Sequence, residues 1–302
     1  MIREVGINNR IYDYDESRMP AMYADSGDTI IFNAEDFVGN LLTNEKVLKS
    51  HIIAEGFVCQ PCNGDVYING AEPGDTLKIT IDKVEITADQ GTIALFPPDF
   101  EIYGKYLDKE ETMKVPLVDG KAILFGGKLE LPVKPMVGAI AVCPHGVAED
   151  TVTPGSYGGN MDCKLITEGT SLYLPVFVPG ALLNMGDVHA IQGDGETFSA
   201  LEVPSRVTVT VELIKARQEK WPVLETKDKW YIIASADGLD TATAEAMEAA
   251  YHFLVSRGGG YDKKEWIVLL GLIGDVEVCN VVDPRVAVRL GIPKSAADKI
   301  HF

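Results

Sequence analysis

Hydrophobic and polar residues alternate with a period of two over much of the first two thirds of the chain. The clearest case covers residues 75–87, where Leu77, Ile79 and Ile81 alternate with polar residues. Successive side chains of a strand point to opposite faces, so this pattern predicts a strand with one buried face. The apolar positions then shift by one near Asp82, which predicts a β-bulge or bend of the kind that curves a sheet or barrel.

Similar patterns predict a mainly β protein made of β-sandwich or β-barrel lobes. Further strands are expected at residues 139–142, 171–178, 206–213, 230–234 and 276–282.

Helical periodicity appears only late in the chain. Residues 242–256 carry small and apolar residues at helical spacing, and glycines 258–260 follow. A second helix is expected after Asp262, which can act as its N-cap, with Glu265 at the third position after the cap. Because residues 266–270 are uniformly apolar, we expect this second helix to be buried.

The order of these elements suggests a domain division. We expect a β-rich catalytic region at residues 1–216, which could form two β lobes. A smaller α+β lobe with two helices is expected at residues 217–302. The predicted break lies around residues 217–229, where charged residues flank a proline. Residues 110–127 are of mixed character and could form a cover over a site, although an ordinary surface segment is the preferred interpretation.

Composition narrows the classes of function. A formal net charge of −18 disfavours binding to nucleic acid, because phosphates would be repelled. The five cysteines are an odd number without the spacing of a secreted disulfide framework, so we expect reduced thiols. The first residues lack the apolar core of a signal peptide, and no stretch is long and apolar enough for a transmembrane helix. These features predict a cytoplasmic protein without a membrane partner.

Most of the candidate chemistry lies between residues 155 and 196. Three pairs of polar residues are spaced two apart, and on a strand the members of such a pair point to the same face. The pairs are Asn160 with Asp162, Asp187 with His189, and Asp194 with Glu196.

Asp187 and His189 form the strongest local candidate for a metal site. A carboxylate and an imidazole on one face supply two ligands of the type that zinc prefers. Asp162 is the predicted third ligand, because the preceding glycines 158–159 allow a tight turn and close approach to a ligand. The alternative is a turn followed by a buried structural histidine, and spacing alone does not decide between the two.

Other polar residues of this region have further expected roles. Glu196 is a candidate general base on a metal-activated water, although an exposed strand carboxylate would show the same pattern. Asp194 is better explained by the turn that its Asp-Gly pair favours. His51 is a possible fourth metal ligand. Cys59 and Cys62 lack the second ligand pair of a zinc site and are expected to be incidental.

Cys163 offers a different chemistry, that of the nucleophile in a cysteine-dependent amidase. On an extended chain, however, its side chain points away from that of Asp162, so only one of the two can face a site.

Several separate motifs resemble the acetamidase/formamidase family. The likeness covers most of the chain, and the similar segments are residues 66–77, 158–162, 172–176, 179–181, 186–196 and 281–285. The resemblance implies a mostly β protein with a small C-terminal α+β part, a homodimer, and metal-dependent hydrolysis of short aliphatic amides to a carboxylate and ammonia. The family's polar cluster corresponds here to Asn160, Asp162, Asp187, His189 and Glu196.

On this basis Asp162, Asp187 and His189 are expected to hold one divalent metal, zinc first and calcium as the alternative. Glu196 would act as general base, and Asn160 would hydrogen-bond the substrate's carbonyl oxygen. The competing hypotheses are a cysteine-dependent amidase that uses Cys163 and a non-catalytic β-rich metal-binding protein.

Overall fold

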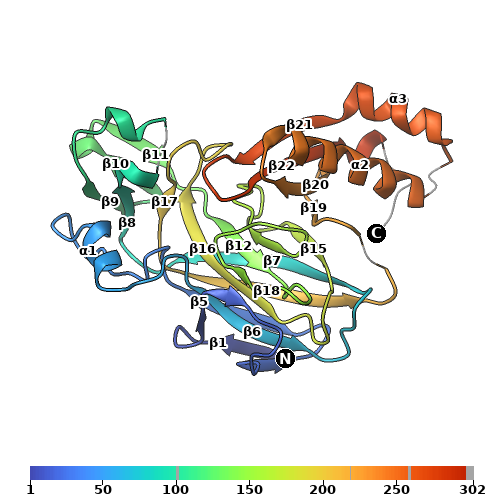
Figure 1. Ribbon diagram of the computed structural model, residues 1–302, viewed down its shortest axis with the longest axis horizontal. Helices are drawn as coiled ribbons and strands as arrows, with labels where there is room; N and C mark the ends of the chain where they lie inside the picture. The colour runs from blue at the N-terminus through green and yellow to red at the C-terminus, as the bar shows by residue number, and fades with distance from the viewer. Residues whose placement is uncertain (100–101, 218, 258–259, 297–302) are drawn as a thin grey trace.

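Two large β-sheets pack against each other in the computed structural model, which describes residues 1–302 except 100–101, 218, 258–259 and 297–302 (Figure 1). One continuous core of buried side chains, drawn from strands of both sheets, lies between them. The mainly β fold expected from the sequence is therefore confirmed.

The first sheet has nine strands among the described residues. Their order is β1 (Ile2–Val5), β5 (Thr29–Ala34), β18 (Ser205–Ile214), β7 (Thr76–Ile86), β15 (Ser171–Pro175), β19 (Val223–Glu225), β20 (Lys229–Ala236), β22 (Val286–Pro293) and β21 (Asp275–Asn280).

The second sheet has eleven strands in the same described ranges. Its main path is β11 (Leu129–Pro132), β10 (Lys121–Leu124), β9 (Glu111–Val118), β8 (Gln90–Leu95), β17 (Leu201–Glu202), β16 (Leu183–Ile191), β12 (Met136–Ala141) and β14 (Gly158–Asn160). Strand β6 (Cys62–Ile68) pairs with β16 and also with the short strands β2 (Arg10–Ile11) and β4 (Met22–Ala24). A separate pair joins β3 (Asp13–Tyr14) to β13 (Glu149–Asp150).

The helices are α1 (Lys49–Ala54), α2 (Leu239–Arg257) and α3 (Lys263–Ile273), with short 3-10 turns at Pro97–Asp99, Gly104–Tyr106, Phe125–Gly127 and Lys294–Ala296. None of the helices in the described part of the chain is long and apolar enough to cross a membrane.

The predicted bulge in the long strand is present. Thr208 of β18 pairs with Lys83 and the next residue, Val209, pairs with Ile81. Asp82 is therefore the extra residue, and the apolar positions before and after it reach the same buried face.

The C-terminal helices cover one face of the first sheet. Helix α2 buries the apolar residues whose spacing predicted it, and they pack on side chains of β20 and β22. Helix α3 begins with the predicted capping box, in which Asp262 accepts from the Glu265 N–H and Glu265 accepts from the Asp262 N–H.

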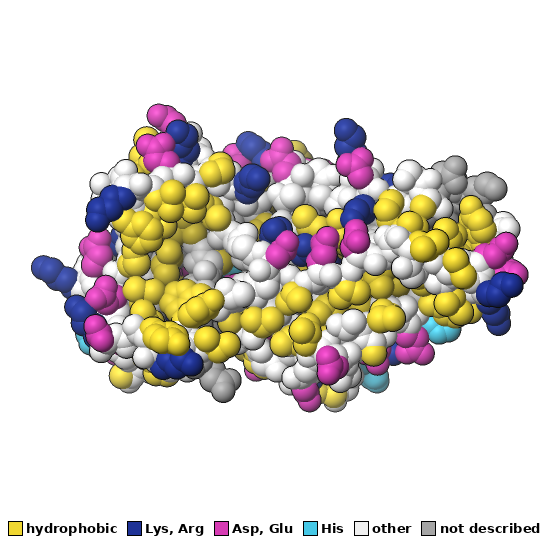
Figure 2. All heavy atoms as spheres, turned by 90° about the horizontal axis from the view of Figure 1, so that it is seen from above, with side chains coloured by type: hydrophobic (Ala, Val, Ile, Leu, Met, Phe, Trp, Pro, Cys, Tyr) yellow, Lys and Arg dark blue, Asp and Glu magenta, His cyan; other side chains and the backbone are white. Residues whose placement is uncertain are grey.

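The expectation that residues 266–270 are buried is wrong in part. Trp266 is buried, but Ile267 and Val268 are 60% and 54% exposed, because α3 packs against its neighbours with one side only. Apolar side chains spread widely over this upper face of the molecule (Figure 2). The domain division remains a prediction, and strands β19 and β20 continue the first sheet beyond residue 216.

Candidate active site

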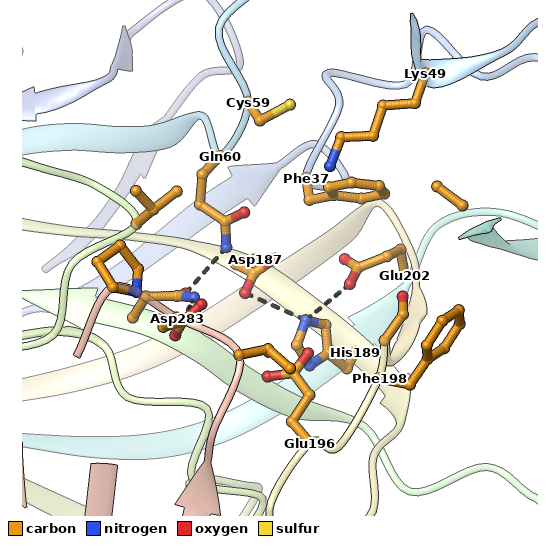
Figure 3. A pocket seen from close by; sticks show the side chains of 16 residues that line it. Phe37, Lys49, Cys59, Gln60, Asp187, His189, Glu196, Phe198, Glu202 and Asp283 are labelled. Carbon is orange, nitrogen blue, oxygen red and sulfur yellow. Dashed lines mark hydrogen bonds and ion pairs between the residues drawn. The ribbon is translucent and has the colours of Figure 1, made fainter. Parts of the chain in front are cut away.

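A cavity of about 280 Å³ lies against strands β8, β17 and β16 of the second sheet and contains much of the predicted chemistry (Figure 3). Its described lining includes the expected residues Asn160, Asp187, His189 and Glu196. It also includes residues that were not expected from the sequence, among them Lys49, Gln60, Glu202 and Asp283, and the apolar side chains Phe37, Ala94 and Phe198.

Neighbouring strands place three of the polar side chains. Asp187 and His189 lie two residues apart on β16, and Glu202 of β17 is the cross-strand partner of His189. Directly opposed residues of an antiparallel pair are close neighbours on one face. The Nε2 atom of His189 is accordingly 3.2 Å from Oδ2 of Asp187 and 3.1 Å from Oε1 of Glu202.

Asp162 follows β14 and lies beside the same histidine from the other side. Its Oδ1 atom is 3.8 Å from Nδ1 of His189, and both side chains are almost completely buried. The structure thus brings together all five residues of the predicted cluster, since Asp162, His189 and Glu196 also form one compact group.

The absence of a side chain at Gly138 of β12 leaves room for the carboxylates of Asp162 and Asp187. A β-carbon at this position would lie 2.5 Å from Oδ1 of Asp162 and 2.5 Å from Oδ2 of Asp187. Both distances are shorter than van der Waals contact, so a side chain here would displace the carboxylates.

Gly138→Ala is therefore expected to displace both carboxylates and to weaken any zinc binding at this site by roughly 10- to 100-fold, the effect of disturbing the support of metal ligands. Isothermal titration with zinc measures it. Gly6→Ala is the matched control, because a β-carbon at Gly6 meets nothing within 4 Å. Equal zinc affinities of the two variants would contradict this account of Gly138.

Several site residues have unusual backbone conformations. The φ angles are +46° for Asp162, +52° for Asp187, +35° for Glu196 and +66° for Gln60. Residues other than glycine rarely adopt positive φ, and such conformations concentrate at functional sites, where the surrounding structure maintains them.

Glu196 reaches the cavity from the loop between β16 and β17. Its neighbour Gly195 connects this loop to β21 through two contacts. The Gly195 N–H donates to the Val278 carbonyl over 2.9 Å, and Gly195 forms a β-bridge with Asn280. Asp194 points elsewhere and forms ion pairs with Lys164 at 2.6 Å and with buried Arg289 at 2.8 Å. Asp194 thus stabilises the loop that carries Glu196.

Asn160 holds two carboxylates. Its Nδ2 donates to Oδ2 of Asp162 over 2.8 Å and to Oδ2 of Asp283 over 3.0 Å, while its Oδ1 accepts from Nε2 of Gln60 over 3.0 Å. Both N–H groups of the Asn160 amide are therefore engaged. In this conformation Asn160 has no donor left for the hydrogen bond to a substrate oxygen that was expected.

Gln192 orients His189. The Nε2 atom of Gln192 donates to the Asp162 carbonyl over 2.6 Å, so its Oε1 faces Nδ1 of His189 at 2.8 Å and accepts a hydrogen bond. When the imidazole is neutral, a proton on Nδ1 leaves the lone pair on Nε2, the atom that lies between Asp187 and Glu202.

Burial and mutual repulsion raise the pKa values of the acidic groups. Burial raises the pKa of Glu202 to about 7 and that of Glu196 well above its usual value. Burial, with a smaller contribution from the charge of Asp283, raises the pKa of Asp162 well above its usual value. For His189, burial lowers the pKa, but Glu202 and Asp187 outweigh it and raise the pKa well above the usual value.

The residues present fit a divalent metal. Four buried carboxylate oxygens have no hydrogen-bond partner within the described residues: Oδ1 of Asp162, Oδ1 of Asp187, Oε2 of Glu196 and Oε2 of Glu202. Unpaired buried anionic oxygens are costly unless a cation compensates them. The Nε2 atom of His189 lies 3.2 Å from Oδ2 of Asp187 and 3.1 Å from Oε1 of Glu202. These separations are close to the distance of about 3.4 Å between two ligand atoms of a tetrahedral zinc ion with bonds of about 2.1 Å.

The thiols lie apart from this arrangement. Cys163 is fully buried, and its sulfur lies 3.9 Å from Nη1 of Arg289, which also contacts Cys279. Burial raises the pKa of Cys163, but Cys279 and Arg289 outweigh burial and lower it to about 7. Cys163 is not among the described lining residues of the cavity, and its contacts are with Arg289 and Cys279 of the first sheet.

Cys59, Cys62 and His51 belong to none of the potential metal-binding groups among the described residues. Cys59 lines the cavity, whereas Cys62 is buried in β6, and the part of the chain that the structure describes contains no metal-binding group formed by this pair. His51 is exposed on α1 and does not join the described clusters.

Sequence reasoning missed Glu202, Asp283 and Gln60. Glu202 stands alone as a charged residue in the apolar run of residues 200–203, which is a signal for a buried functional acid. Asp283 lies in the segment 281–285 that resembles the family, but no role was assigned to it. Gln60 lies between Cys59 and Cys62, and no local pattern marks it as a functional residue.

Comparison with known proteins places this fold and site in a family. The model of the "Acetamidase/Formamidase family" matches residues 136–299. An acetamidase of Mycolicibacterium smegmatis and a formamidase of Methylophilus methylotrophus are each 44% identical over 75 residues, which cover 24% of this chain and 18% of each relative. The match thus spans less than a fifth of these curated relatives.

Solved structures extend the likeness over the whole chain. The crystal structure of an acetamidase from Bacillus halodurans has a TM-score of 0.92 and 33% identity, covering 99% of this chain and 100% of that one. A predicted acetamidase/formamidase from Thermoanaerobacter tengcongensis has the same TM-score and identity, covering 100% and 99%. A γ-lactamase from Delftia acidovorans, 18% identical with a TM-score of 0.64, shares the fold (99% of this chain, 94% of that one). This chain belongs to the acetamidase/formamidase family.

Proposed function

We propose that the protein is a metal-dependent amidohydrolase that cleaves short aliphatic amides, such as acetamide and formamide, to a carboxylate and ammonia. The observation that carries this proposal is the cluster of buried carboxylates with unpaired oxygens around His189. Three of these acids, Asp187, Glu196 and Glu202, line the cavity, and the chain is a member of this family. Apolar side chains of Phe37, Ala94 and Phe198 line the same cavity and suit a short alkyl group.

Asp187, His189 and Glu202 are the proposed metal ligands. The geometry supports Glu202 rather than Asp162 as the third ligand, because Gln192 engages the Nδ1 atom that faces Asp162. Zinc is the proposed metal, since it favours three protein ligands of this type and an open position in catalytic sites. When bound, the metal would polarise the amide carbonyl and lower the pKa of water in the open position.

The chain's own residues would handle the protons. Glu196 accepts a proton from the attacking water and delivers it to the leaving nitrogen, which departs as ammonia. Burial raises the pKa of Glu196 well above its usual value, which makes its carboxylate a stronger proton acceptor. Asn160 fixes Asp162 and Asp283 in place, and these acids position the reacting groups rather than bind metal.

Ammonia release from formamide, acetamide and propionamide tests the proposal, with wild type and His189→Ala measured after zinc loading. We expect turnover of at least one amide by wild type and its loss in the variant. If wild type releases no ammonia from any of these amides with zinc, calcium or manganese, the proposed activity is wrong, and metal binding without catalysis becomes the better account.

A homodimer, which the family resemblance implies, is also part of the proposal. The exposed apolar side chains of Ile267, Val268 and Leu272 on α3 support it, because water-exposed patches of this kind often mark interfaces between subunits.

A further inference from the structure

We propose that Gln60 recognises the unsubstituted NH2 group of the substrate and so selects primary amides over N-substituted amides. This inference rests on the proposed function and deepens it by naming a specificity residue. Gln60 precedes β6, lines the cavity and is 7% exposed.

The backbone of Gln60 is held firmly in an uncommon conformation. Its N–H donates to the Phe37 carbonyl over 2.7 Å, and its carbonyl accepts from the hydroxyl of Thr151 over 2.5 Å. These contacts maintain the positive φ of Gln60 and direct its side chain at Asn160. A strained, well-anchored polar residue in a cavity is typical of a functional position.

The direction of the Gln60 amide follows from its neighbours. Asn160 uses both N–H groups on the carboxylates of Asp162 and Asp283, so its Oδ1 must face Gln60. Only the NH2 group of Gln60 can donate to that oxygen, which it does over 3.0 Å. The Oε1 atom is therefore turned away from Asn160, and Figure 3 shows it pointing into the cavity.

An acceptor fixed in this way selects for a donor. The carbonyl oxygen of a substrate amide cannot donate a hydrogen bond to Gln60, whereas the NH2 group of the substrate can. With the carbonyl oxygen at His189 and the proposed metal, the NH2 group can donate one hydrogen to Oε1 of Gln60. Replacing that hydrogen with a methyl group leaves a buried acceptor unpaired and adds bulk. Sites that hydrogen-bond a substrate group reject analogues that lack it.

The test compares wild type with Gln60→Met, a substitution of similar length without an acceptor of comparable strength. For acetamide, kcat/KM is expected to fall roughly 10- to 100-fold, as for the loss of one buried hydrogen bond. For N-methylacetamide, kcat/KM should change much less, so the preference for the primary amide shrinks. The inhibition constant of acetate, which has no N–H group, should remain within about twofold, because its binding does not use this acceptor.

Gln90→Met is the matched control, because Gln90 lies on β8 outside the described lining of the cavity, and its kinetics should equal those of wild type. An equal loss of acetamide turnover, N-methylacetamide turnover and acetate binding in Gln60→Met would show that Gln60 only supports Asn160. Equal wild-type rates on the two amides would also overturn the proposal. A wild type that is inactive on all amides would instead refute the proposed function.

Discussion

Exchanging Glu196 for glutamine is expected to lower kcat for acetamide by about 10²- to 10⁴-fold, the usual contribution of a general acid–base group. Glutamine keeps the shape of the side chain but can no longer accept and return a proton. The side chain of Glu196 is buried and lines the cavity. Its Oε2 atom has no hydrogen-bond partner among the described residues. Steady-state kinetics with acetamide measures the effect.

The metal content of this variant shows whether Glu196 is a general base or a metal ligand. We expect Glu196→Gln to bind zinc as tightly as wild type, which elemental analysis and zinc titration can establish. Glu248→Gln on the exposed side of α2 is the matched control and should change neither quantity. A Glu196→Gln enzyme that loses zinc in proportion to its activity would show that Glu196 is a metal ligand, as its closeness to Asp162 and His189 permits.

Local sequence patterns predicted those features that depend on local geometry. The period-two alternation around Leu77 predicted β7, and the phase shift at Asp82 predicted its bulge. The Asp262 and Glu265 pair predicted the start of α3. The spacing of Asp187 and His189 similarly placed both on one strand. In each case the residues that interact are close in sequence, so the pattern contains the information.

The features that were missed depend on contacts between distant parts of the chain. Glu202 meets His189 only through the pairing of β16 with β17, and Gln60 meets Asn160 across one hundred positions. Burial of α3 was overestimated for the related reason that an apolar sequence does not specify which neighbours cover it. Hydrophobic periodicity gives the orientation of a side chain on its own element, but not the element that packs opposite.

Glu202→Gln is expected to lower zinc affinity by more than 100-fold, whereas Asp162→Asn should lower it by roughly 10- to 100-fold. Loss of a ligand exceeds the 10- to 100-fold effect of disturbing an outer residue, and Asp162 is placed outside the proposed ligand set. Both substitutions conserve volume and replace a carboxyl group with a carboxamide, so each controls for the loss of a buried carboxyl group in the other. Titration with zinc in competition with a coloured chelator gives the two affinities. The reverse order would assign the metal to Asp162, as the sequence alone suggested. That result would also require the imidazole of His189 to turn, because Gln192 now accepts the hydrogen bond from Nδ1.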